Sequence, residues 1–236
     1  AQVALTERAS ARTDFELVAA DSGAAVCYDA GDAAVVETAA GLFAADVARV
    51  TGREIPVVAG QELPAKTRCA VIVGTIGQSR WIDELTAAKK IDVSAIEGGW
   101  ERYAIRLVER PGHGVRKALG SDRRGTAYGL LSVSRAIGVS PWYWWADAPV
   151  RHRDRLTLRV GDFTSESPSV KYRGIFINDE DWGLYRWAKE NFEKELGNIG
   201  PKTYEKVCEL LLRLQANYLA PAMHDATTAF YKIPEN

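Results

Sequence analysis

The chain has 236 residues, 47% of them hydrophobic and seven of them tryptophan, enough for one large domain or one ordinary domain plus part of another. Its 30 basic and 31 acidic residues give a net charge of −1 without long runs of one sign, which argues against a nucleic-acid or anionic-membrane surface. No apolar run approaches the ~20 residues of a membrane helix. From the charge and from the lack of such a run we expect neither nucleic acid nor membrane as a partner, but a neutral polymer or small ligand.

The first elements predict the start of an α/β domain. Two strand-like stretches, 15–20 and 24–28, flank a short Ser-Gly turn and predict a β-hairpin. Apolar residues then recur at helical spacing from Asp32, the expected N-cap, to Thr51. Gly52 is expected to end this helix.

Further strands and a second helix follow. Strands are expected at 55–58, 69–73, 103–108 and 156–160. The stretch 69–73 is apolar throughout, which is typical of a strand buried on both faces. A helix is expected to begin after Ser121-Asp122 and to end at Gly138. This order predicts a mixed α/β amino-terminal domain over residues 1–161.

The composition changes after this block. Residues 162–169 are rich in Ser, Thr, Asp and Pro and predict an interdomain linker. Beyond it we expect a strand at 172–177, a helix from Pro201 to Leu214, and a second apolar segment at 217–222. Strand, helix, strand is the repeat of a parallel barrel or of a doubly wound sheet.

The most informative motif is the polar run that follows the strand at 172–177. In a parallel barrel, side chains directly after a strand lie where a substrate binds, so the candidate residues are Asn178, Asp179, Glu180, Asp181 and Trp182. The three carboxylates suit sugar hydroxyls or the acid and base of a glycosidase. A solvated loop that caps the next element and a divalent cation site remain alternatives.

Two other motifs allow both a functional and a packing interpretation. The aromatic run at 140–147 suits stacking on sugar rings or core packing; as a strand it would place Trp142 and Trp144 on one face. The junction at 120–126 offers backbone N–H groups to an anion, or is a tight turn with an N-cap.

Histidines and cysteines add one candidate. His113 and His152 have no partner at ligand spacing, whereas His224 follows the second apolar segment and is a candidate for the pocket. The cysteines lack the paired spacing of a zinc site, and we interpret them as buried thiols: Cys27, Cys69 and Cys208. We predict no metal and no cofactor.

Four motifs in order, at 120–129, 138–147, 172–182 and 211–223, resemble glycoside hydrolase family 115, the xylan α-1,2-glucuronidases. The resemblance implies removal of glucuronic acid or its 4-O-methyl form from xylan by an inverting mechanism. It also implies a mixed α/β domain followed by a (β/α)₈ catalytic barrel, here over residues 170–236.

The resemblance assigns substrate contacts to the polar run Asn178, Asp179, Glu180, Asp181 and Trp182. At the second strand the family usually has Trp where this chain has Ala220 and His224, so contacts at that wall differ. The implied partners are glucuronoxylan or its oligosaccharides. A secreted or periplasmic location is expected because such polymers lie outside the cytoplasm.

A complete barrel takes about 250 residues, far more than the segment 170–236 provides. We therefore expect an incomplete (β/α)₈ barrel, with the catalytic acid and base beyond Asn236. We also expect the chain alone to be inactive and its partner to be the remainder of the same polypeptide. Two alternatives are a non-catalytic carbohydrate-binding or interaction module and, with less support, a metal-dependent transferase.

Overall fold

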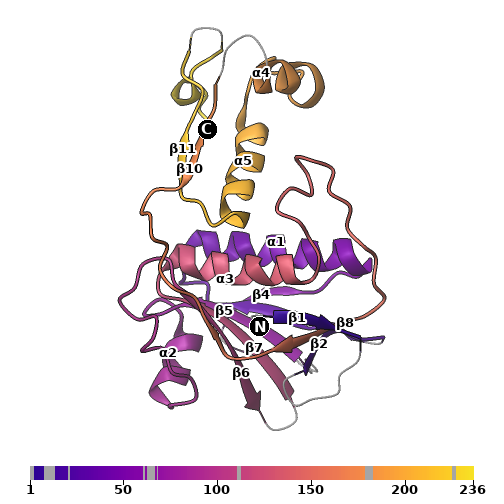
Figure 1. Ribbon diagram of the computed structural model, residues 1–236, viewed down its shortest axis with the longest axis vertical. Helices are drawn as coiled ribbons and strands as arrows, with labels where there is room; N and C mark the ends of the chain where they lie inside the picture. The colour runs from indigo at the N-terminus through magenta and orange to yellow at the C-terminus, as the bar shows by residue number, and fades with distance from the viewer. Residues whose placement is uncertain are drawn as a thin grey trace. The chain divides into compact units, whose positions relative to one another are not determined.

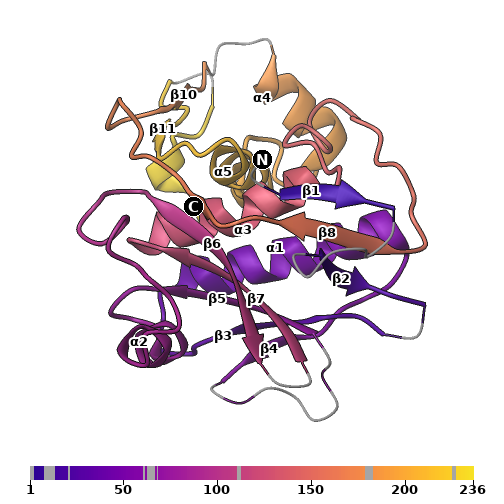
Figure 2. The ribbon, with the colours of Figure 1, turned by 60° about the horizontal axis from the view of Figure 1, so that its bottom comes forward.

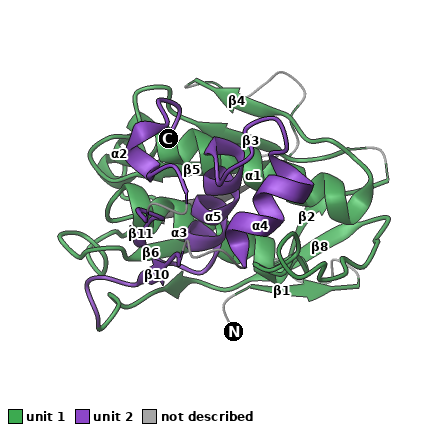
Figure 3. Ribbon diagram, turned by 90° about the horizontal axis from the view of Figure 1, so that it is seen from above, with its two compact units in different colours: residues 1–169 green, residues 170–236 purple. Residues whose placement is uncertain are grey.

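The computed structural model describes residues 3–7, 14–20, 22–60, 62, 67, 69–110, 113–178, 183–224 and 227–236. The chain divides into two compact units, residues 1–169 and 170–236, which are coloured separately in Figure 3. Each unit is described by itself below.

The larger unit is built on a six-stranded sheet in the order β4-β3-β5-β7-β6-β9 (Figure 1). The first four of these strands run parallel, β6 is antiparallel to β7, and β9 is antiparallel to β6. The strands are β3 (Ala25–Tyr28), β4 (Val57–Ala59), β5 (Cys69–Thr75), β6 (Tyr103–Arg110), β7 (His113–Gly120) and β9 (Phe163–Thr164). The mixed α/β class predicted for this part of the chain is therefore correct.

Helices cover both faces of this sheet. Helices α1 (Ala34–Thr51) and α3 (Arg123–Ala136) lie side by side over one face, and α2 (Arg80–Ala87) lies over the other (Figures 1 and 2). On the α2 side, Ile82 packs in one apolar cluster with Cys27 and Ile72. Because β5 has helices on both faces, its residues 69–73 are all apolar, which is the signal that predicted a buried central strand.

The predicted hairpin between 15–20 and 24–28 is wrong. Strand β2 (Asp14–Val18) pairs with β8 (Leu156–Val160) and not with β3, and β1 (Val3–Thr6) pairs with the other edge of β8. The turn itself exists, since Ala19 N–H donates to Ser22 O at 2.8 Å, but the ladder consists of the single bridge Val18–Gly23. Strands β2 and β3 belong to two different sheets. The pairing of β2 with the distant strand β8 therefore outweighs a local hairpin with β3.

The helix ends confirm Gly52 and Asp122 as predicted caps, but not Asp32. Gly52 ends α1 with a φ of 70°, a left-handed conformation that glycine adopts without steric cost. Asp122 caps α3, accepting from the N–H groups of Arg124 and Gly125. Asp32 is not the N-cap of α1; the cap is Ala33. A carboxylate oxygen of Asp32 instead accepts from the N–H group of Thr75, the last residue of β5, at 2.7 Å.

Part of the predicted linker belongs to the large sheet. Phe163 and Thr164 form β9, and Ser165 continues the contact by accepting from Tyr103 N–H with its hydroxyl at 2.8 Å. Arg106 donates to Phe163 O and to the Thr164 hydroxyl. The polar composition of this segment reflects an edge strand held by side-chain hydrogen bonds, and the division between the two units falls after Ser169.

The smaller unit contains one strand, helix, strand repeat. Strands β10 and β11 pair in parallel, with Gly174 opposite Tyr218 and Phe176 opposite Ala220. The elements are β10 (Gly174–Phe176), α4 (Leu184–Trp187), the π-helix η1 (Ala188–Phe192), α5 (Pro201–Arg213), β11 (Tyr218–Ala220) and the 3₁₀ turn η2 (Phe230–Lys232). The two strands and the helix from Pro201 were predicted; the short helices before it were not.

Candidate functional site

Two of the predicted site residues lie in the segments that follow the two parallel strands. Asn178 follows β10 and His224 follows β11, and both are exposed. Ile177 N–H donates to Ala220 O at 2.8 Å, so the pairing continues past the end of β10. The other predicted residues, Asp179 to Trp182, lie outside the described residues.

A pocket of about 770 Å³ lies where these strands end. It lies within the smaller unit, and its lining residues come from both strands, the segment after β11 and η2: Phe176, Asn178, Tyr218, Leu219, Ala220, Pro221, Met223, His224, Phe230 and Tyr231. The structure thus brings together Asn178 and His224, as the strand-end rule predicts. The contribution of Phe230 and Tyr231 was missed, because nothing in the periodicity of the last residues marks them.

The described lining is mainly apolar and aromatic. Phe176 is 73% exposed and Tyr231 is 68% exposed, so both rings are available to a ligand. Aromatic rings stack on the apolar faces of sugar rings, while amide, imidazole and phenol groups match sugar hydroxyls. Among the described lining residues there is no Asp, Glu, Lys or Arg. This wall can bind a neutral polar ring, but its described side chains include no carboxyl group for acid or base catalysis.

The glycine of the Tyr-Arg-Gly-Ile-Phe motif permits this architecture. A Cβ at Gly174 would overlap the carbonyl group of Tyr218 on the neighbouring strand. Only a residue without a side chain lets β10 approach β11 this closely.

Arg173 and Asn217 fix the starts of the two strands. The Arg173 guanidinium donates to Gln215 O from Nε at 2.9 Å and from Nη2 at 2.7 Å. Arg173 N–H donates to the Asn217 side-chain oxygen at 3.0 Å, and Asn217 Nδ2 donates to Lys171 O at 2.8 Å. These bonds set the register that places Asn178 and His224 at the same edge.

The junction at 120–126 is a capped turn, and its N–H groups are used within the chain. Asp122 Oδ1 accepts from Arg124 N–H at 3.0 Å and from Gly125 N–H at 2.8 Å. The side chain of Arg124 pairs with the buried carboxylate of Glu101 at 2.6 Å. Asp122 therefore occupies the position of an anion at this helix start, which favours the packing interpretation.

The aromatic run at 140–147 is a series of turns and not a strand, so the predicted alternation of Trp142 and Trp144 does not apply. The Arg49 guanidinium lies 4.1 Å from the centre of the Tyr143 ring. Trp144 and Trp145 meet edge to face at 4.8 Å. Trp142 is 46% exposed. These ring contacts favour the packing interpretation of the run.

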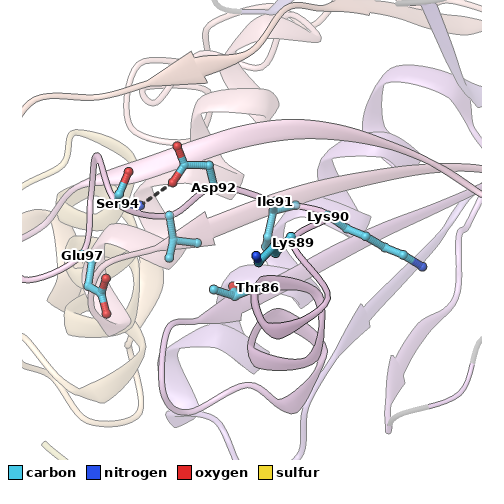
Figure 4. A pocket seen from close by; sticks show the side chains of 8 residues that line it. Thr86, Lys89, Lys90, Ile91, Asp92, Ser94 and Glu97 are labelled. Carbon is cyan, nitrogen blue, oxygen red and sulfur yellow. Dashed lines mark hydrogen bonds between the residues drawn. The ribbon is translucent and has the colours of Figure 1, made fainter.

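A second pocket, of about 440 Å³, lies beside the end of α2 in the larger unit (Figure 4). Lys89, Lys90 and Glu97 in its lining are exposed, and the Asp92 carboxylate accepts from Ser94 N–H at 2.9 Å. Acidic and basic side chains both contribute to it, and no sequence motif marks it. We assign it no role.

Cysteine burial follows the prediction only in part. Cys27 is buried, Cys69 is half-buried and Cys208 is exposed on α5, so interpreting all three as buried thiols is wrong for Cys208. Among the residues that the structure describes, no group of three or more His, Cys, Asp or Glu side chains is arranged to hold a metal ion. Within the same ranges, no helix is long and apolar enough to cross a bilayer.

Comparison with known proteins identifies the class. Residues 165–236 match the model of glycosyl hydrolase family 115. A solved family GH115 4-O-methyl-α-glucuronidase, described as having specificity for decorated arabinogalactans, is 40% identical over 90% of this chain, with a TM-score of 0.76. Residues 165–236 thus carry the pattern of glycosyl hydrolase family 115, and the chain is similar over 90% of its length to a solved protein of that family. The chain spans 26% of the length of that solved protein.

The same match extends the resemblance into the first half of the chain, where the sequence motifs are weak. The match to a solved N-acetyl-β-hexosaminidase of Streptomyces plicatus covers 87% of this chain and 30% of the hexosaminidase chain, at 12% identity and a TM-score of 0.47. A similarity this low says nothing about function. The search of curated proteins gives no match.

Proposed function

We propose that the chain forms part of a glycoside hydrolase that removes glucuronic acid, or its 4-O-methyl form, from a polysaccharide such as glucuronoxylan. The observation that carries this proposal is the aromatic pocket at the ends of β10 and β11, within the segment that matches the family model. The solved relative is described as specific for decorated arabinogalactans. An experiment must therefore decide whether the substrate polymer is a glucuronoxylan or a decorated arabinogalactan.

In this proposal β10, α5 and β11 are the first elements of a (β/α)₈ barrel, and the segment after Asn178 carries polar contacts to the sugar. Asp179, Glu180 and Asp181 are the substrate-binding candidates there, with Trp182 and His224. An inverting glycosidase needs two carboxyl groups roughly 6.5–9.5 Å apart. We place that pair in the remainder of the enzyme polypeptide, and we place the enzyme outside the cytoplasm, where its polymers are.

The charge of the wall suggests which part of the substrate it contacts. A glucuronate carboxylate is best recognised by Arg or Lys, and the described lining contains neither. We therefore propose that Phe176 and Tyr231 contact neutral sugars of the polymer backbone. Neutral oligosaccharides of the backbone should then compete for this wall, and free glucuronate should not.

The test is the double variant Asp179→Asn, Asp181→Asn in the enzyme that contains this chain. Release of uronic acid from glucuronoxylan and from decorated arabinogalactan is measured, with the anomer of the first product read by NMR. We expect a rate about 100-fold lower on the preferred polymer, from loss of charged contacts. Glu195→Gln, an exposed acid elsewhere in the unit, is the control. Unaltered turnover in the double variant would remove the polar run from the site.

The second candidate is a non-catalytic carbohydrate-binding module. It is favoured by one observation, a pocket lined by rings without a described carboxylate. Calorimetry on the chain with xylo-oligosaccharides and galacto-oligosaccharides, together with an assay of uronic acid release by the parent protein, separates the two. A binding module binds the oligosaccharides and its parent protein releases no uronic acid. An enzyme binds them and its parent protein releases uronic acid.

A further inference from the structure

The backbone after β11 has a hydrogen-bonding problem that a side chain on α5 solves. The ladder ends at Ala220, and Pro221 has no N–H group to donate. The next residue, Ala222, is 1% exposed, so its N–H group needs a partner inside the protein. That partner is the hydroxyl oxygen of Tyr204, at 3.1 Å.

The same tyrosine also contacts the second segment that lines the pocket, around Phe230. The ring of Tyr204 meets the ring of Phe230 edge to face, with centres 4.6 Å apart and an interplanar angle of 87°. Phe230 N–H in turn donates to Ala222 O at 3.0 Å. Tyr204, Ala222 and Phe230 thus form a closed set of contacts that joins α5 to both lining segments.

Tyr204 is 4% exposed and does not itself line the pocket. Every lining residue from Pro221 to His224 lies within two positions of Ala222, and Tyr231 follows Phe230 directly. We propose that Tyr204 is a positioning residue that fixes the wall formed by Pro221, Met223, His224, Phe230 and Tyr231. Its effect on ligand binding rests on the proposed function; its effect on the wall does not.

The experiment uses the full chain with Tyr204→Phe, which keeps the ring and removes only the hydroxyl. Hydrogen–deuterium exchange is followed at the amides of Ala222 and Phe230 and, for reference, at Ile177 in the strand pairing. Tyr185→Phe is the matched control, a half-buried tyrosine of the same unit that is outside the pocket. We expect exchange at Ala222 and Phe230 to rise about fivefold or more, with Ile177 and the control unchanged. Unchanged exchange at Ala222, or an equal rise at all three amides, overturns the proposal.

Calorimetry with xylotetraose and with a galacto-oligosaccharide supplies the second readout. If either binds the unaltered chain, Tyr204→Phe should weaken it about fivefold while Tyr185→Phe does not. Equal affinities for the variant and the unaltered chain overturn the positioning role. If neither sugar binds the unaltered chain, the proposed carbohydrate contact fails, and the exchange measurement alone decides whether Tyr204 fixes the wall.

Discussion

The Asp122 carboxylate holds Glu101 and helix α3 at the same time. Its Oδ2 atom accepts from Glu101 N–H at 2.7 Å, while its Oδ1 atom accepts from the N–H groups of Arg124 and Gly125 in the first turn of α3. Glu101 has a φ of 53°, unusual for a residue other than glycine, and its side chain returns to pair with Arg124. The loop before β6 and the start of α3 therefore depend on each other.

Asp122→Ala should destabilise the larger unit by about 2–3 kcal/mol, since it removes an N-cap and leaves the Glu101 amide without its acceptor. Urea unfolding followed by circular dichroism measures the change. Asp154→Ala is the control, because the contact of Asp154 with His152 at 3.3 Å is exposed and its loss should cost less than about 0.5 kcal/mol. Equal losses in the two variants would show that the shared carboxylate has no special weight.

Glu193→Gln should destabilise the smaller unit by about 2 kcal/mol. The buried Glu193 carboxylate accepts from Gly200 N–H at 3.0 Å and from Thr203 N–H at 2.8 Å, at the start of α5, where Gly200 supplies no side chain. The amide of the Gln side chain keeps one acceptor oxygen and lacks the negative charge of the Glu193 carboxylate. Hydrogen exchange within α5 reports the effect, and protection equal to that of the exposed control Glu195→Gln would contradict it.

Gly174→Ala should break the pairing of β10 with β11, because the new Cβ would overlap the Tyr218 carbonyl group. We expect a loss of about 3 kcal/mol in the smaller unit and loss of exchange protection at Ile177. Gly41→Ala is the opposite control: nothing lies within 4 Å of its added Cβ, it is exposed on α1, and it should stabilise by about 0.5–1 kcal/mol. A tolerated Gly174→Ala would mean that the strands can separate without harm.

Alkaline pH should weaken the larger unit through Cys27. Burial raises the pKa of the Cys27 thiol to about 11, from an ordinary value of 9.0. The folded state favours the protonated thiol, so the thiol's contribution to the free energy of unfolding is fully present below pH 9 and is lost as the pH rises through 11. By pH 10.5 this loss should amount to about 2 kcal/mol. Urea unfolding at pH 7.5 and 10.5 measures it. The loss should shrink in Cys27→Ala and persist in Cys208→Ala; equal losses in both would point to other groups.

Local signals predicted the elements that they specify directly. Continuous apolar residues mark β5, and Asp122 and Gly52 mark helix ends, because each of these rules concerns neighbours in the chain. The partner of β2 was missed because it is β8, more than a hundred residues away, and the chain between them gives no sign of it. Strand β9 was hidden because its two residues are held by Arg106 and Ser165, not by an apolar pattern.

The site divides in the same way. Asn178 and His224 follow strands, and parallel pairing brings strand ends together, so the sequence was sufficient to place both at one pocket. Tyr204 and Phe230 could not be found, since one lies on a helix at an ordinary buried position and the other in a segment without periodicity. Their role depends on a buried N–H group that only the structure reveals.

The sequence separations within the smaller unit have a kinetic consequence. Glu193 and Thr203, at the start of α5, are ten residues apart, whereas Arg173 and Asn217, at the start of the strand pairing, are 44 apart. Short loops close faster and at lower entropic cost than long ones. We expect α5 to be formed in the rate-limiting transition state and the strand pair to be completed after it. Glu193→Gln should therefore slow refolding, while substitutions of Asn217 should chiefly speed unfolding.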